Sequence, residues 1–268
     1  MAIADFHNDI LTSSNFDFKT VAFEDNAVIT AIFRGKRSFE EAIALTKYSK
    51  LIAFEDVGYS DLCFEKMIGA NPLYVGLTWN GENDFGYGCD YSFGLKRKGI
   101  EFIKELNKYK VAIDTAHISK RGFIDIIDNA EIVVNSHTCF NGIFKHKRNL
   151  DDWQIKLLLE RGGFIGVACC GYFMTNRKTC KITDYTDNIM YFYEKYGADV
   201  LCVGTDFNGT DFVPTKLENY CGFKLVENDL IERGIPKTEV EKILYSNLYN
   251  FIKRKIKTAW QGTSVVVY

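Results

Sequence analysis

The chain alternates between short apolar runs and longer stretches in which apolar residues recur every three or four positions. The first pattern is typical of buried β-strands, and the second of helices with one buried face. Eight runs predict strands, over residues 3–7, 27–33, 51–54, 73–78, 111–115, 131–135, 164–168 and 200–204. Six amphipathic stretches predict helices, over residues 38–49, 95–109, 119–128, 151–161, 183–196 and 237–257. Strands and helices therefore alternate along most of the chain.

Local signals support several of the predicted helix ends. Ser38 is followed three residues later by Glu41, and this spacing is typical of a capping box at a helix start. Gly162 and Gly197 come just after predicted helix ends, where glycine is favoured because it adopts the left-handed conformation easily. These signals strengthen the predicted alternation.

The alternation predicts an α/β fold whose strands run parallel. Eight strand–helix units in 268 residues match the size of a (β/α)₈ TIM barrel, although this length would also suit two small domains. An open doubly wound sheet is the competing architecture, but the first strand is not followed by a Gly-x-Gly-x-x-Gly motif. We therefore predict one barrel domain over residues 1–268, with residues 258–268 as an extended or disordered tail.

Composition and charge narrow the range of partners. The chain is 47% hydrophobic and 25% charged, as expected of a globular protein. Its 33 basic and 35 acidic residues give a net charge of −2 without a basic tract, which argues against nucleic acid as a partner. With no apparent leader or membrane-spanning apolar run, we predict a cytoplasmic protein without a membrane partner. The pattern permits a homodimer.

The cysteines do not suggest a disulfide framework or a thiolate metal site. There are eight of them, and no two have Cys-x-x-Cys spacing. A chain of this size can bury a core without disulfides, so most of these residues are expected to pack as small apolar side chains.

Polar residues gather where the predicted strands end. In a parallel barrel the carboxyl ends of all strands meet at one mouth, where the chemistry of such barrels is built. Five predicted strands end in histidine or acidic residues, namely His7 and Asp9, Glu55 and Asp56, Asp114 and His117, Ser136 and His137, and Thr205 and Asp206. These include three of the four histidines in the chain. The fourth, His146, lies in a lysine-rich segment and is expected to be exposed.

Each of these residues alone has an ordinary structural explanation. A lone histidine after a strand more often makes a structural hydrogen bond than binds a metal, and a lone acid there often caps the next helix. Together they are harder to explain, because several carboxylates at one mouth repel and lose solvation unless a cation is present. Histidine and carboxylate ligands without thiolate suit Zn²⁺ or a similar divalent ion. A carboxylate between two such sites can bridge two ions, and Glu55 is the natural bridge.

Several short motifs carry a more specific signal. They are Asp5-Phe6-His7-Asn8-Asp9, Phe54-Glu55, Leu77-Thr78-Trp79-Asn80, Leu106-Asn107, Ile113-Asp114-Thr115-Ala116-His117, Asn135-Ser136-His137, Lys147-Arg148-Asn149, Gly204-Thr205-Asp206-Phe207-Asn208-Gly209 and Ile243-Leu244-Tyr245-Ser246-Asn247. In these motifs the chain resembles the renal, or membrane, dipeptidase family of zinc peptidases, a branch of the metal-dependent amidohydrolase barrels. The resemblance runs from the first strand almost to the last helix.

The resemblance implies a binuclear zinc site and a dipeptide substrate. By this resemblance, His7 and Asp9 hold one zinc ion, His117 and His137 hold the other, and Glu55 bridges the two. A hydroxide that bridges the metals then attacks the peptide carbonyl.

The resemblance also assigns roles to two further residues. It implies that Asp206 carries the proton from the attacking water to the leaving amine. It also implies that Arg148 binds the terminal carboxylate of the substrate, which suits the forked guanidinium. Without this match, Arg148 would be interpreted as one more surface cation beside the neighbouring lysines.

One position in the motifs departs from the family pattern. Trp79 stands where animal members of the family carry a histidine. We expect Trp79 to contact the substrate.

Two alternative functions remain open from the sequence. The barrel and its metals could instead hydrolyse another small amide or a lactone. The chain could also be a non-catalytic, metal-stabilised binding protein. Turnover of dipeptides, assayed beside lactones, distinguishes the three hypotheses.

Overall fold

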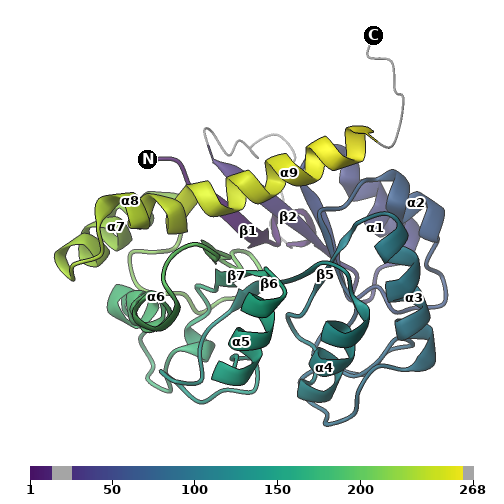
Figure 1. The fold of residues 1–268 in the computed structure, drawn as a ribbon, viewed down its shortest axis with the longest axis horizontal. Coiled ribbons are helices and arrows are strands. Elements are labelled where there is room, and N and C mark those ends of the chain that lie inside the picture. The colour runs from purple at the N-terminus through teal and green to yellow at the C-terminus, as the bar shows by residue number, and fades with distance from the viewer. Residues whose placement is uncertain (14–25, 262–268) are drawn as a thin grey trace.

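Eight parallel strands form a closed barrel in the computed structural model, which describes residues 1–13 and 26–261, with side chains up to residue 255 (Figure 1). The strands are β1 (Ala4–Asn8), β2 (Ala27–Phe33), β3 (Ile52–Glu55), β4 (Tyr74–Gly76), β5 (Ala112–Asp114), β6 (Val133–Thr138), β7 (Phe164–Val167) and β8 (Leu201–Val203). Each strand pairs with its neighbours in chain order, and pairing of Asp5 in β1 with Val203 in β8 closes the ring. The predicted (β/α)₈ barrel is confirmed.

The observed strands differ from the predicted ranges by a few residues. Strand β6 continues to Thr138, because Thr138 still pairs with Val167 of β7 after a register shift. His137 therefore lies within a strand, not just after it as predicted. Strand β3 ends on Glu55 itself, which pairs with Phe33. These pairings hold both side chains in regular backbone at the mouth of the barrel.

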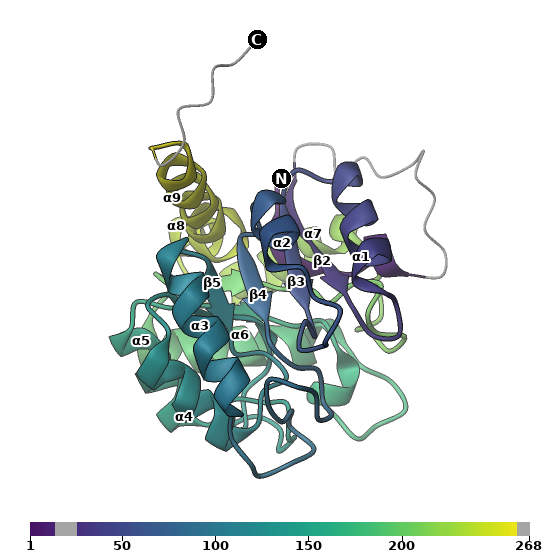
Figure 2. The same ribbon diagram turned by 90° about the vertical axis from the view of Figure 1, so that its right-hand side faces the viewer.

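Helices surround the strands and cover the outside of the barrel (Figures 1 and 2). They are α1 (Phe39–Leu45), α2 (Phe64–Gly69), α3 (Arg97–Lys108), α4 (Lys120–Asn129), α5 (Asp152–Glu160), α6 (Ile182–Tyr196), α7 (Phe223–Glu232), α8 (Lys237–Glu241) and α9 (Asn247–Gln261). The capping box of Ser38 and Glu41 is present at the start of α1. Gly162 and Gly197 follow α5 and α6 with φ values of 64° and 78°, which explains the preference for glycine there.

Two helices were not predicted from the sequence, and one predicted helix is divided. Helix α2 is only six residues long and has no side-chain cap, and α7 continues directly from a 3₁₀ turn. Helix α2 lacks a local start signal, and the only such signal for α7 is Asn219, which caps the 3₁₀ turn before it. The helix predicted over residues 237–257 consists of α8, a π-helical segment (Lys242–Ser246) and α9.

The predicted tail is partly wrong. Helix α9 continues to Gln261, so residues 258–261 are helical and not an extended tail. The remaining tail residues, 262–268, lie outside the described residues.

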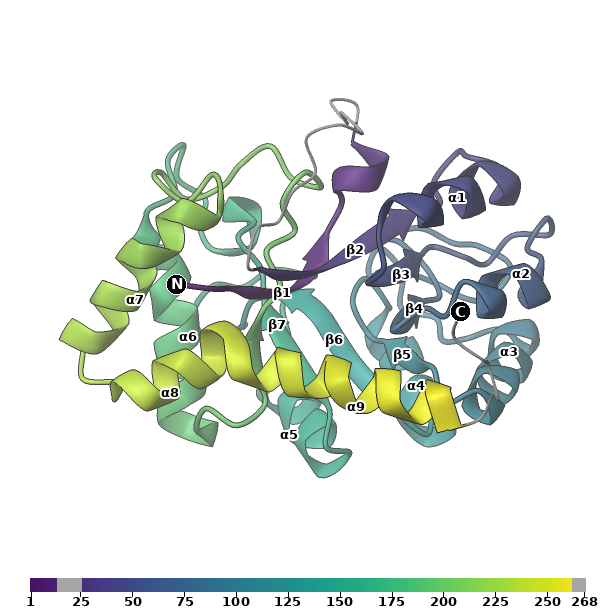
Figure 3. The ribbon, with the colours of Figure 1, turned by 90° about the horizontal axis from the view of Figure 1, so that it is seen from above.

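Helix α9 crosses one end of the barrel (Figure 3). Its side chains Leu248, Phe251 and Ile252 are buried in one apolar cluster with residues from inside the strands, including Phe6 and Tyr74. The Phe6 ring contacts Phe251 at a centroid distance of 5.5 Å and Tyr74 at 5.6 Å. The amino-terminal end of the barrel is therefore filled with packed side chains, and the polar residues lie at the other end.

None of the helices in the part of the chain that the structure describes combines the length and apolar character needed to cross a membrane. The eight cysteines are free thiols, and five of them are buried. The cytoplasmic location and the homodimer stay predictions.

Removal of the Phe251 ring, which helps to fill the amino-terminal end of the barrel, should destabilise the fold. Phe251 is buried between Phe6 and Phe164, so we expect Phe251→Ala to lower the free energy of unfolding by about 3–5 kcal/mol, as for other buried phenylalanines. Denaturant unfolding would measure this loss. Leu225→Ala, on the exposed side of α7, is the control and should change stability by less than about 0.5 kcal/mol. Equal losses of stability in the two variants would contradict the role of Phe251 in the packed core.

Candidate functional site

The five predicted metal ligands come together at the carboxyl end of the barrel. His7 projects from β1, Glu55 from the end of β3 and His137 from β6, whereas Asp9 and His117 follow β1 and β5. All five side chains are buried. His117 has a φ of 62°, a conformation that is uncommon for a non-glycine residue and that turns the chain sharply after β5.

Glu55 lies at the centre of this cluster. Its Oε2 atom is 3.2 Å from Nε2 of His7, and its Oε1 atom is 3.3 Å from Nε2 of His117. His7 Nε2 is also 3.3 Å from Oδ2 of Asp9, and His117 Nε2 is 2.8 Å from Nε2 of His137. One carboxylate oxygen therefore faces the His7 and Asp9 pair, and the other faces the two remaining histidines.

The Nδ1 atom of His7 makes a hydrogen bond that orients its ring. This atom is 2.7 Å from the hydroxyl of Tyr74, which itself donates to the carbonyl of Phe6 at 3.0 Å. The Tyr74 oxygen therefore accepts from Nδ1–H of His7. The Nε2 atom of His7 is therefore the ring nitrogen that faces Glu55.

The other two histidines are oriented in the same way. Nδ1 of His117 donates to Oδ1 of Asn80 at 2.7 Å. Nδ1 of His137 is 2.8 Å from Oγ of Ser136, and the Ser136 hydroxyl donates to Oδ2 of Asp114 at 2.5 Å. All three Nε2 lone pairs thus converge on one space, which is how protein frameworks orient histidine ligands of metals.

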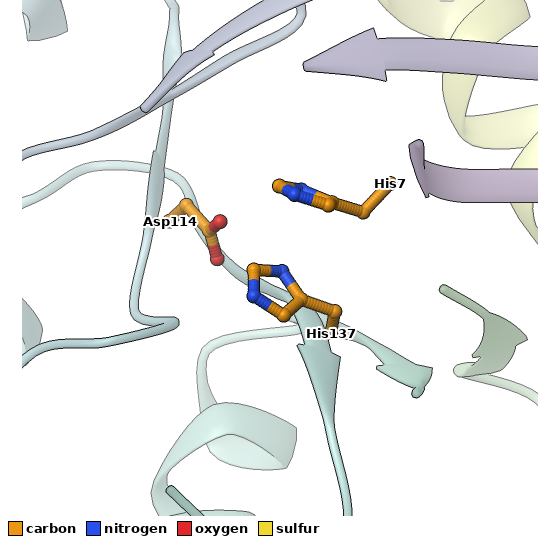
Figure 4. Close-up of side chains that lie close together, drawn as sticks. All are labelled: His7, Asp114 and His137. Carbon is orange, nitrogen blue, oxygen red and sulfur yellow. The ribbon is translucent and has the colours of Figure 1, made fainter. Parts of the chain in front are cut away.

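Asp114 lies beside the cluster and holds its neighbours in place, rather than lying at the centre. Figure 4 shows its carboxylate beside the rings of His7 and His137, and the ligand atoms of these three residues lie within 4.8 Å of one another. However, Asp114 already accepts hydrogen bonds from the hydroxyl and the backbone N–H of Ser136 and from the N–H of Ala116. It is therefore better placed to orient His137 through Ser136 than to bind an ion.

The cluster fits a metal ion. Nε2 of His7 and Oδ1 of Asp9 are buried and have no hydrogen-bond partner. Such atoms are costly to bury unless something else satisfies them. Two further groups of donor atoms lie within 4.8 Å of one another, one formed by Glu55, His117 and His137 and the other by His7, Asp9 and Asp206. Imidazole and carboxylate donors in this number suit a divalent cation.

The protonation equilibria of the cluster agree with this interpretation. Burial raises the pKa of Glu55 to about 7, and the charges of Asp9 and Asp114 add to the shift. Burial lowers the pKa of His117 and His137 well below the usual value, so both rings are neutral. Burial also disfavours a proton on His7, but the groups around it, Asp9 included, raise its pKa well above the usual value. A positive charge between His7 and the carboxylates is thus favoured, and a metal cation supplies one.

Asp206 approaches the cluster from a sharp turn after β8. It has a φ of 60°, and its backbone N–H donates to the carbonyl of His7 at 3.0 Å. Burial raises the pKa of its carboxyl well above the usual value, and the charge of Asp9 contributes. A Cβ atom on Gly209 would lie 2.3 Å from Asp9 Oδ2 and 2.5 Å from Asp206 Oδ1. Gly209 therefore leaves the space that these two carboxylates occupy.

Arg148 is buried beside the cluster and is not a surface cation. Its Nη2 atom is 3.4 Å from the carbonyl oxygen of His137, and its guanidinium lies 5.2 Å from the centroid of the Phe173 ring. Its Nε atom is buried without a hydrogen-bond partner, and no carboxylate among the described residues forms an ion pair with it. A buried guanidinium without a counter-ion is suited to an anionic group of a ligand.

Trp79 lies on the rim of the site. Its ring centroid is 5.9 Å from that of His117, and the side chain is 45% exposed. His146, which was expected to be exposed, is half-buried, because its ring packs 5.0 Å from that of Phe173. All eight predicted site residues are therefore brought to the same end of the barrel.

Sequence analysis missed the residues that hold the histidines. Asn80, Asp114 and Ser136 all lie within the quoted motifs but were not assigned a role, and Tyr74 was interpreted only as part of a strand. A signal for Asp114 and Ser136 was present, since each is polar and lies at the end of a buried strand.

Comparison with sequences of known proteins supports a family assignment. The family model of the membrane dipeptidases (peptidase family M19) matches residues 60–263. A curated relative from Klebsiella pneumoniae, described as an uncharacterised protein in the pqqA 5′ region, is 28% identical over 200 residues, which cover 70% of this chain and 72% of that protein.

Solved structures share the fold. The structure described as dipeptidase AC, a metallopeptidase of family M19, has a TM-score of 0.83 at 17% identity and covers 95% of this chain and 98% of its own. A metallopeptidase from Rhodobacter sphaeroides, liganded with a phosphinate mimic of the dipeptide L-Ala-D-Ala, has a TM-score of 0.81 at 15% identity, with 95% and 99% coverage. With the family model matching most of the sequence, the chain belongs to the membrane dipeptidase family, peptidase family M19, whose members are metallopeptidases.

Proposed function

We propose that this protein is a dipeptidase that uses two zinc ions to hydrolyse the peptide bond of dipeptides. The observation that carries the proposal is the position of Glu55, whose two oxygens lie 3.2 Å and 3.3 Å from the Nε2 atoms of His7 and His117. A carboxylate that faces two separate sets of ligands is the arrangement by which two metal ions are bridged.

In this proposal, the ligands divide into two sets. His7 and Asp9 hold one ion, His117 and His137 hold the other, and Glu55 serves both. When bound, the zinc ions polarise the carbonyl of the substrate and lower the pKa of a bound water molecule to near neutral. The Nδ1 hydrogen bonds of the three histidines keep their Nε2 atoms aimed at these positions.

Asp206 is the proton carrier in this proposal. Its carboxylate lies beside His7 and Asp9 at the open side of the cluster, where it can accept a proton from the attacking water. The same carboxyl can then return this proton to the leaving amine.

Arg148 binds the carboxylate at the end of the dipeptide. Its lack of an acidic partner leaves the guanidinium free to make two parallel hydrogen bonds to such a group. This contact holds the substrate by a group outside the reacting bond, and so aligns the peptide carbonyl with the cluster. It also favours dipeptides over internal bonds of proteins, because an internal residue has no free carboxylate. The dipeptide mimic bound by the Rhodobacter relative supports this class of substrate.

Metal content and turnover should be separable by one substitution. We expect the wild-type protein, purified without chelator, to contain about two zinc ions per chain and to hydrolyse dipeptides. Asp206→Asn should keep the metal and lose about 10²–10⁴-fold in kcat, because the proton carrier is removed. Elemental analysis and a dipeptide assay on the same samples measure both quantities, with the exposed Asp199→Asn as the control.

Each other outcome of this experiment has a definite meaning. Loss of both metal and turnover in Asp206→Asn would show that Asp206 is a ligand and not the proton carrier. Metal without dipeptide turnover in the wild type would favour another amide or a lactone as substrate, or a non-catalytic binding role. Absence of metal even after added zinc would contradict the proposal as a whole.

The role of Arg148 can be tested with matched substrates. We expect the wild type to hydrolyse Ala-Ala at least about thirtyfold more efficiently than Ala-Ala amide, which lacks the carboxylate. In Arg148→Ala this ratio of kcat/KM values should approach one, because the guanidinium that distinguishes the two substrates is absent. The neighbouring Lys147→Ala is the control, and an Arg148→Ala enzyme that keeps the wild-type ratio would disprove the contact.

The hydrogen bonds that orient the His137 ring should control metal affinity. Ser136→Ala removes the acceptor of the Nδ1 hydrogen bond and disconnects His137 from Asp114, so we expect zinc affinity to fall about 10–100-fold. Competition with a fluorescent zinc chelator measures this change without reference to turnover. The control is Ser92→Ala at an exposed position, and an unchanged affinity in Ser136→Ala would refute the support role.

A further inference from the structure

Trp79 presents a large apolar surface next to the metal cluster. It comes three residues after the end of β4 and lies between two aromatic rings, with centroid distances of 5.4 Å to Phe33 and 5.9 Å to His117. His117 is buried, whereas Trp79 is 45% exposed to solvent. What sets Trp79 apart from other exposed apolar side chains is its place beside the buried cluster, where a ligand that reaches His117 can cover the indole.

The segment that carries Trp79 is fixed. The backbone N–H of Trp79 donates to Oδ1 of Asp56 at 3.1 Å, and the Asp56 carboxylate is itself held by the hydroxyl of Tyr59 at 2.7 Å. On the other side, Gly88 packs so closely that a Cβ atom there would lie 1.8 Å from the carbonyl oxygen of Trp79. The backbone of Trp79 is therefore held on both sides, which fixes where its side chain leaves the loop.

The next residue in the chain joins this loop to the catalytic centre. Asn80 accepts the Nδ1 hydrogen bond of His117 at 2.7 Å and also lies 3.1 Å from Sγ of Cys89. The position of Trp79 is thus tied to the position of a proposed zinc ligand. Any substrate whose peptide carbonyl approaches His117 must come close to the indole, since two extended residues span only about 7 Å.

We propose that Trp79 is a specificity-determining residue that selects dipeptides with an aromatic or other large apolar side chain. This inference rests on the proposed dipeptidase function and adds the class of side chain. A substrate ring that packs on the indole removes apolar area of both groups from water and makes a favourable aromatic pair. A glycine residue in the same place makes no such contact. Selectivity therefore comes from a contact on the rim, whereas Arg148 and the metal cluster act on groups that every dipeptide has.

The test compares three substrates with the zinc-loaded full chain. The values of kcat/KM for Phe-Gly, Gly-Phe and Gly-Gly are measured in the wild type, Trp79→Ala, Trp79→His and Trp79→Phe. We define the aromatic preference as the higher of the two phenylalanine values divided by the Gly-Gly value. We expect the preference to fall about tenfold in the Ala and His variants and to be mostly retained in the Phe variant, because the Phe ring restores an aromatic contact.

A matched tryptophan serves as the control. Trp153 on α5 is 38% exposed and packs on Phe123 at a centroid distance of 5.6 Å. Trp153→Ala should keep the wild-type preference. If Trp79→Ala does not fold, Trp79→His answers the same question, since it keeps a ring of smaller apolar area.

A second readout does not depend on turnover. Binding of Gly-Phe to the zinc-loaded Asp206→Asn protein should change the tryptophan fluorescence, and most of that change should disappear in the Asp206→Asn, Trp79→Phe double variant.

Two results would overturn the inference. One is a wild-type enzyme that hydrolyses Gly-Gly at least as well as both phenylalanine substrates, and the other is a Trp79→Ala variant that loses the same factor on all three. Failure of the proposed function gives a different result, namely no turnover of any dipeptide by a zinc-loaded wild type.

Discussion

The contact of Glu55 with two separate histidines is the interaction on which the rest of the site depends. A buried carboxylate 3.2 Å from His7 and 3.3 Å from His117 is stable only if positive charge lies nearby. Burial and neighbouring acids raise the pKa of Glu55 to about 7, so a negative charge on this carboxyl is disfavoured unless a positive charge lies beside it. A cation relieves this repulsion and at the same time satisfies the lone pairs that converge there.

Packing at the opposite end of the barrel supports this cluster. Phe251 of α9 contacts Phe6, Phe6 contacts Tyr74, and the Tyr74 hydroxyl binds Nδ1 of His7. A continuous column of aromatic rings thus connects the amino-terminal end of the barrel to His7, one of the proposed metal ligands. Because such interiors are closely packed, a side chain in this column cannot move without moving its neighbours. The orientation of His7 therefore depends on the core as well as on its own hydrogen bonds.

The site combines a rigid centre with a more accessible rim. The ligands and Arg148 are buried, whereas Asp206 is partly exposed and Trp79 is half-exposed. The proposed metal ligands are held by hydrogen bonds within the barrel. The residues proposed to meet the substrate or to exchange a proton with it are more accessible. This division explains how a shared barrel can serve different substrates through changes at its rim.

The sequence by itself determined the alternation of eight strands with helices and the placement of histidine and acidic residues at the strand ends. These features depend on local patterns of apolar and polar residues, and the family motifs carry the same information. Sequence patterns did not predict α2, which lacks a capping residue, or α7, whose 3₁₀ start is marked only by Asn219, nor the continuation of α9 through residues 258–261.

Only the tertiary structure decided which nitrogen of each histidine faces the cluster. The hydrogen bonds responsible link His7 to Tyr74 and His117 to Asn80, pairs that lie 67 and 37 positions apart. Closure of the barrel brings these partners together, and no local pattern specifies such a pairing. The same holds for Arg148, whose burial against Phe173 depends on the packing of two loops, and which the lysine-rich sequence around it would have left at the surface.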